Sequence, residues 1–78
     1  MLISLVHGSR TTLVSVNSSD SVRILYQKAG TVLKLDHGGF GLLLAADLLL
    51  EDRRLIDYEI LNGESVSVVI RAHGGPHP

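Results

Sequence analysis

The sequence predicts an α+β roll, in which a mixed sheet of four to five strands covers one helix. Four segments of the 78 residues have the length and the apolar or β-branched content of strands, with side chains that alternate between two faces. A single segment between the second and third strands has apolar residues at helical spacing. A hairpin, one helix and then further strands form a roll, with the first and last strands as parallel neighbours at its centre.

The N-terminal part predicts a β-hairpin over residues 1–17. Residues 1–6 (MLISLV) are apolar and of strand length, and residues 11–17 (TTLVSVN) are rich in β-branched side chains. Between them, Gly8-Ser9 suits a tight turn because glycine accepts a positive φ. In the first strand Met1, Ile3 and Leu5 should share one face, and Leu2, Ser4 and Val6 the other.

One helix is expected after residues 17–21 (NSSDS), whose Ser and Asp side chains can accept hydrogen bonds from the first helical turn. Apolar residues then recur at spacings of three and four, which predicts one buried helical face. The members of this face are Val22, Leu25, Tyr26, Ala29, Val32 and Leu33. Residues 30–32 (GTV) are poor helix formers and leave the end of the helix open. Residues 36–41 (DHGGFG) predict a loop.

The second half predicts two more strands. Residues 41–47 (GLLLAAD) are expected to form the third strand, and residues 64–71 (ESVSVVIR) the last, which alternates over 65–70. The segment between them has no clean period and predicts irregular, short-turned structure. In the last strand Val66, Val68 and Ile70 should share one face, and Ser67, Val69 and Arg71 the other. We expect one domain over residues 1–71 and a flexible tail over 72–78.

Composition argues against several classes of function. A net charge of −1, with seven scattered Lys and Arg residues, argues against a nucleic-acid partner. Without cysteine the chain has no disulfide, thiol nucleophile or zinc–thiolate site, and we expect a reducing, intracellular environment. No apolar run approaches the ~18 residues that span a membrane. The four histidines lack metal-ligand spacing, so we expect no metal and no cofactor.

Several stretches together resemble ubiquitin. They are LEDRRLIDYEI (50–60), ESVSVVIR (64–71) and the Gly-Gly that follows, with Met1 and Ile3 at the start and Ser-Asp before the helix. The resemblance covers about residues 1–75 and implies the ubiquitin-like β-grasp roll. It also implies a protein modifier rather than an enzyme, with no catalytic residue of its own.

The resemblance places function at the tail. A protease would cut after Gly74-Gly75, an activating enzyme that contacts Arg71 would adenylate the Gly75 carboxylate, and conjugating enzymes would join it to an amine of a target. Glycine is required because only a residue without Cβ passes through narrow active-site clefts. Pro76-His77-Pro78 would be removed. The resemblance further implies a monomer in the cytoplasm, the nucleus or both.

Ubiquitin-binding proteins should contact an apolar surface of the sheet. The resemblance maps this surface to Val69 and Leu44, or to Leu43 if the register shifts by one. Leu48 and Leu49 add apolar side chains where ubiquitin is polar. Ser67 stands where ubiquitin has the histidine of this surface, so the usual ubiquitin-binding modules should bind this chain weakly.

A different class of function stays open. The chain could be a non-conjugated ubiquitin-like domain that docks partners through the same apolar surface, alone or as part of a larger fusion. Two other patterns favour structural roles. The loop GGFG (38–41) lacks the phosphate-loop fingerprint, and the hydroxyl of Tyr58 should hold the loop that precedes it rather than act with Asp57 in catalysis.

Overall fold

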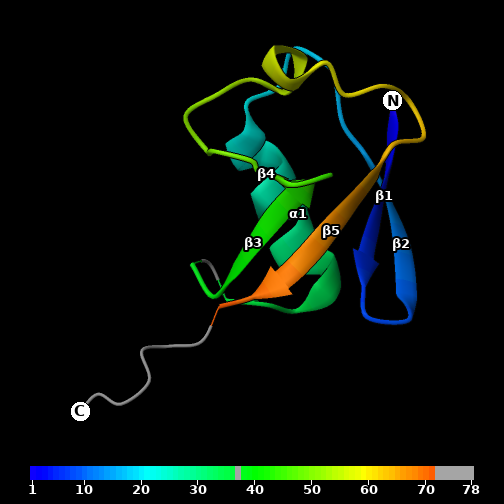
Figure 1. The fold of residues 1–78 in the computed structure, drawn as a ribbon, viewed down its shortest axis with the longest axis vertical. Coiled ribbons are helices and arrows are strands. Elements are labelled where there is room, and N and C mark those ends of the chain that lie inside the picture. Colours follow the sequence, from blue (N-terminus) through cyan, green and yellow to red (C-terminus); the bar gives the residue numbers. More distant parts are fainter. Residues whose placement is uncertain (37, 72–78) are drawn as a thin grey trace.

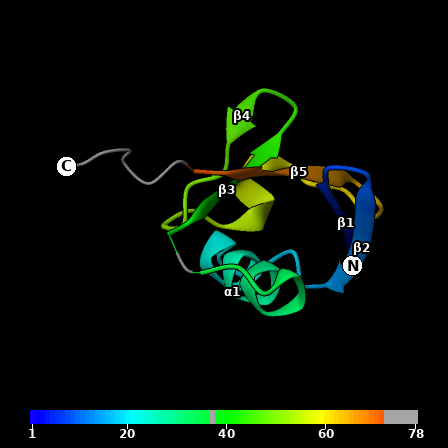
Figure 2. The same ribbon diagram turned by 90° about the horizontal axis from the view of Figure 1, so that it is seen from below.

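The structure is a computed structural model that describes residues 1–36 and 38–71. It confirms the predicted α+β roll. The elements in chain order are β1 (Leu2–His7), β2 (Arg10–Ser15), α1 (Val22–Leu33), β3 (Phe40–Leu44), β4 (Asp47–Leu48), the 3-10 helix η1 (Leu55–Tyr58) and β5 (Ser65–Ile70). The strands form one five-stranded sheet in the order β2-β1-β5-β3-β4 (Figure 1). Figure 2 shows α1 on one side of this sheet.

The central pairing of the sheet is parallel, as predicted. β1 pairs with β5 in parallel, whereas the β1–β2, β3–β5 and β3–β4 pairs are antiparallel. The predicted hairpin is confirmed, and its two-residue turn places Gly8 at a φ of 64°. Beyond β2, Met1 and Val16 exchange two hydrogen bonds: the Met1 ammonium donates to the Val16 carbonyl (2.6 Å), and the Val16 N–H donates to the Met1 carbonyl (2.9 Å).

The helix begins where the sequence predicts, but by a different mechanism. Ser21 occupies the N-cap position and makes no side-chain cap. Instead, the N–H of Val22 donates to the carbonyl of Arg53 (2.8 Å), so the loop before η1 holds the first turn. The Asp20 carboxylate accepts from the N–H of Asn17 (2.9 Å), which fixes the turn upstream. Within the described residues no helix has the length and apolarity to cross a membrane.

The core lies between α1 and the concave face of the sheet. Its fully buried side chains include Ile3 and Leu5 of β1, Leu25 of α1 and Leu42 of β3. Val32 was predicted to join this face but is 46% exposed. It lies at the edge of the apolar stripe of α1, away from the centre of the buried face.

Two side chains hold the irregular segment between β4 and β5, because each accepts a hydrogen bond from a backbone N–H of that segment. The predicted role of Tyr58 is confirmed, because its hydroxyl accepts from the N–H of Leu50 (2.9 Å). Asp57 accepts from the N–H of Arg54 (3.0 Å). Asp57 and Tyr58 therefore both stabilise this loop.

Candidate functional site

A row of side chains crosses the convex face of the sheet, opposite α1. Val6 of β1 is the register partner of Ser67 on β5, which pairs with Leu43 on β3, which in turn pairs with Leu48 on β4. Register partners in a sheet point to the same face, so these four side chains are neighbours across four strands. Three of the four are apolar and lie on the face that α1 leaves uncovered.

A glycine lets the next row pack closely. Gly41 of β3 is the register partner of Val69 on β5. A Cβ on Gly41 would lie 3.2 Å from Cδ1 of Leu48, 3.4 Å from Cγ2 of Val69 and 3.6 Å from Nε of Arg71. The three side chains therefore cover the backbone of Gly41, while Leu48 and Val69 remain 42% and 39% exposed. We call Val6, Leu43, Leu48 and Val69 the outer patch.

Arg71 borders the outer patch at the end of β5. Its N–H donates to the carbonyl of Gly39 (3.0 Å), and the residue is exposed. The chain therefore leaves the sheet beside the outer patch, with a cation at that point. Gly74 and Gly75, the predicted site of processing and conjugation, lie outside the described residues, as does the whole predicted tail 72–78.

The structure brings three of the five predicted surface leucines and valines together and separates the other two. Leu43, Leu48 and Val69 share the convex face, as the register in β3 places them. Leu49 is 1% exposed and belongs to the core, so its prediction as a partner-binding residue is wrong. Leu44 packs against the core rather than on the convex face. The reason is strand alternation: a shift of one residue exchanges the two faces.

Two members of the site were not predicted. The alternation of the first strand places Val6 opposite Ile3 and Leu5, and this signal could have revealed its position on the convex face. Gly41 gives no such signal, because only the relative placement of β3, β4 and β5 shows which side chains cover it.

The outer patch is suited to binding and offers little chemistry. Its side chains are apolar, and the hydroxyl of Ser67 and the guanidinium of Arg71 supply the polar groups beside them. Among the described residues, no three His, Asp or Glu side chains gather as a metal site requires. An apolar centre with a polar border is the arrangement found in many protein–protein interfaces.

Comparisons with known proteins agree with this geometry. No protein-family model matches the chain, and no curated protein does. A similar solved structure is the N-terminal ubiquitin-like domain of the 4931431F19Rik protein, determined in solution. It is 22% identical in sequence, and the match covers 100% of this chain and 81% of that one with a TM-score of 0.86. This chain therefore has the ubiquitin-like β-grasp fold.

Proposed function

We propose that this chain is a ubiquitin-like protein modifier, joined to target amines through the carboxylate of Gly75 and recognised through the outer patch. One observation carries the proposal. Val69 of the outer patch and exposed Arg71 lie at the end of β5, and Gly74-Gly75 follow Arg71 within four positions of the sequence. An enzyme that handles the two glycines could therefore contact Arg71 and the outer patch at the same time.

The chemistry of conjugation requires little of this chain. Hydrolysis of the Gly75–Pro76 bond would free the Gly75 carboxylate. An activating enzyme would convert it with ATP to an acyl adenylate, with release of pyrophosphate. An enzyme cysteine would then displace AMP and form a thioester. A target amine would displace the thiol and form an amide. The glycines permit each enzyme to enclose the backbone closely, since no Cβ intervenes.

Expression in cells of the source organism tests the proposal. The chain carries an N-terminal tag and is compared with its Gly75→Ala variant, and Ala72→Gly serves as the matched control in the same tail. We expect tagged, higher-mass adducts on a denaturing gel for the native chain and for Ala72→Gly, and their loss for Gly75→Ala. Equal adducts with all three chains, or none with any, would contradict conjugation through Gly75.

The second candidate function is docking without conjugation. The outer patch favours it directly, because apolar recognition by a partner needs no covalent step. In this case Leu43→Ser and Val69→Ser should each abolish recovery of a specific partner. Leu61→Ser is the matched control, since Leu61 is an exposed leucine outside the outer patch. A partner that is lost equally with Leu61→Ser would not bind through the outer patch.

A further inference from the structure

A tight turn over residues 61–64 (LNGE) precedes β5. The N–H of Glu64 donates to the carbonyl of Leu61 (3.0 Å), and Gly63 has a φ of 87°. A positive φ at the third position of a turn favours glycine. Asn62 and Gly63 are both exposed, and nothing lies within 4 Å of the position that a Cβ on Gly63 would take. The turn therefore presents an Asn-Gly pair to solvent.

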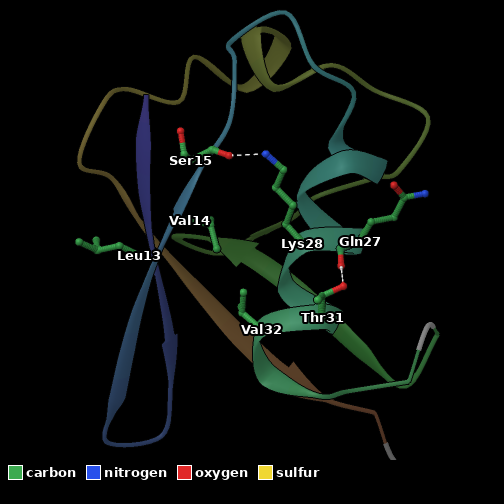
Figure 3. A pocket seen from close by; sticks show the side chains of 7 residues that line it. All are labelled: Leu13, Val14, Ser15, Gln27, Lys28, Thr31 and Val32. Carbon is green, nitrogen blue, oxygen red and sulfur yellow. Dashed lines mark hydrogen bonds between the residues drawn. The ribbon is translucent and has the colours of Figure 1, made fainter.

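Both backbone groups of Leu2 bond to this pair. The N–H of Leu2 donates to Oδ1 of Asn62 (2.6 Å), and the carbonyl of Leu2 accepts from the N–H of Gly63 (2.7 Å). These groups of Leu2 are available because its register partner on β2, Ser15, exchanges no hydrogen bond with it. Figure 3 shows that the carbonyl of Ser15 instead accepts from the ammonium of Lys28 (2.5 Å).

An asparagine that precedes glycine can lose its side-chain nitrogen without an enzyme. The backbone nitrogen of Gly63 attacks Cγ of Asn62, and glycine favours this attack because no Cβ shields its nitrogen. As the new N–Cγ bond forms, the Cγ–Nδ2 bond breaks, and Nδ2 leaves with the proton of the Gly63 nitrogen as ammonia. The product is a five-membered succinimide.

Water then opens the succinimide in one of two ways. Cleavage of the bond between the nitrogen and Cγ gives aspartate. Cleavage of the bond between the nitrogen and the main-chain carbonyl carbon of Asn62 gives isoaspartate, in which the main chain runs through Cγ. Either route consumes one water for each ammonia released.

The two contacts with Leu2 oppose the first step. The Gly63 nitrogen must lose its proton to attack, and the hydrogen bond to the Leu2 carbonyl stabilises the protonated form. The bond from the Leu2 N–H to Oδ1 restricts the rotation by which Cγ could approach the Gly63 nitrogen. The reaction therefore requires the turn to open locally from β1.

We propose that Asn62 is a deamidation site that Leu2 restrains, and that its isoaspartyl product releases the start of β1. Aspartate keeps a side-chain oxygen that can accept from the N–H of Leu2. Isoaspartate adds one carbon to the main chain between Leu61 and Gly63, so the turn and both contacts with Leu2 cannot persist together. This modification is independent of conjugation and of the outer patch.

Incubation of the purified chain at neutral pH, with and without urea, tests the site. Trypsin releases residues 55–71, in which Asn62 is the one side-chain amide, and mass spectrometry measures its conversion to aspartate and isoaspartate. We expect conversion at least tenfold slower in the folded chain than in urea, because local opening limits it. Equal rates would overturn the restraint by Leu2.

Asn17 provides an internal comparison in the same digests. Ser18 follows it, and the Cβ of Ser18 shields the attacking nitrogen. In urea we expect Asn62 to react at least tenfold faster than Asn17. Equal rates in urea, or no conversion of Asn62 there, would overturn Asn62 as the site.

Two single-glycine insertions locate the restraint. An insertion between Gly63 and Glu64 breaks the turn and keeps the Asn-Gly pair. An insertion between Gly8 and Ser9 lengthens the hairpin turn and is the matched control. We expect Asn62 to react at least tenfold faster in the first folded chain than in the second, and equal rates would contradict the proposal.

Hydrogen exchange of the native chain decides if either insertion prevents folding. The Gly63 amide should exchange at least tenfold more slowly in the native chain than in urea, since it bonds to Leu2. An unprotected Gly63 amide would overturn the restraint.

The effect of the product is measured on two isomers of equal mass. The isoaspartyl chain, purified after reaction in urea and refolded, is compared with the Asn62→Asp variant, which differs from it only in the route of the main chain. We expect a lower Tm for the isoaspartyl chain. An equal Tm would contradict release of β1 by this modification.

Discussion

Replacing Tyr26 by Phe tests how the hydroxyl of α1 joins the helix to the sheet. The N–H of Leu49 donates directly to the carbonyl of Leu42 (2.8 Å). The reciprocal bond of this pair is replaced by the Tyr26 hydroxyl, which accepts from the N–H of Leu42 (3.0 Å) and donates to the carbonyl of Leu49 (2.9 Å). Tyr26→Phe therefore leaves a buried donor and a buried acceptor without their partner.

The expected cost follows from burial. Each buried polar group left unsatisfied costs ~1–3 kcal/mol, and partial closure of the gap between Leu42 and Leu49 recovers part of that loss. We expect the free energy of unfolding to fall by about 2 kcal/mol for Tyr26→Phe. At ~4–8 °C per kcal/mol for a domain of this size, Tm should fall by about 8–16 °C.

Tyr58→Phe is the matched control, because it removes the same hydroxyl from an exposed hydrogen bond to Leu50. Water can replace that partner, so we expect a loss of only ~0.5–1 kcal/mol. Thermal and urea unfolding, followed by circular dichroism, measure both variants. If Tyr26→Phe costs no more than Tyr58→Phe, the Tyr26 hydroxyl does not link α1 to β3 as described.

Three further variants test other parts of the fold. Leu25→Ala removes a fully buried side chain of α1 and should lower the free energy of unfolding by ~2–5 kcal/mol in urea; a loss under 1 kcal/mol would place Leu25 outside the core. Lys34→Gly should stabilise the chain by ~1 kcal/mol, because Lys34 ends α1 at a φ of 56°; Lys34→Ala should show no such gain in Tm, and equal values would contradict this origin. Gly8→Ala should destabilise the hairpin by ~1 kcal/mol through its φ of 64° alone, since nothing lies within 4 Å of the added Cβ; an unchanged Tm would contradict the left-handed turn.

Alternation and spacing were sufficient to predict the hairpin, the single helix and β5, but not the rest. β4 and η1 were not predicted, and the third strand, expected over residues 41–47, begins at Phe40 and ends at Leu44. The hairpin, the single helix and β5 each have one clear apolar period, and the parallel pairing of β1 with β5 follows from the order of the elements. The start of α1 was predicted from Ser and Asp, yet its first turn is held by the carbonyl of Arg53, which is distant in sequence. A hydrogen-bond partner so distant in sequence cannot be identified from the residues around the start of the helix.

The register of β3 could not be predicted from its own residues. The run LLLAADLLL contains leucine in both alternation phases, so either phase could be buried. The structure selects the phase that buries Leu42 and Leu49, with Ala45 in a left-handed turn between β3 and β4. The outer patch follows from this selection, because Leu43 and Leu48 then share the convex face.

The exposure of Val32 was not predicted from the sequence. Val32 has the spacing of a core residue, yet it lies at the edge of the apolar stripe of α1 and is 46% exposed.

The most direct test of the proposed function uses the position of Arg71. Trypsin cleaves after arginine, so a target lysine joined to Gly75 would keep the remnant Ala72-His73-Gly74-Gly75 after digestion. We expect mass spectrometry of total cellular protein to find lysines that bear this remnant in cells with the native chain and none in cells with Gly75→Ala. Recovery of the tagged chain with its sequence intact to Pro78, and no lysine with the remnant, would contradict the modifier function.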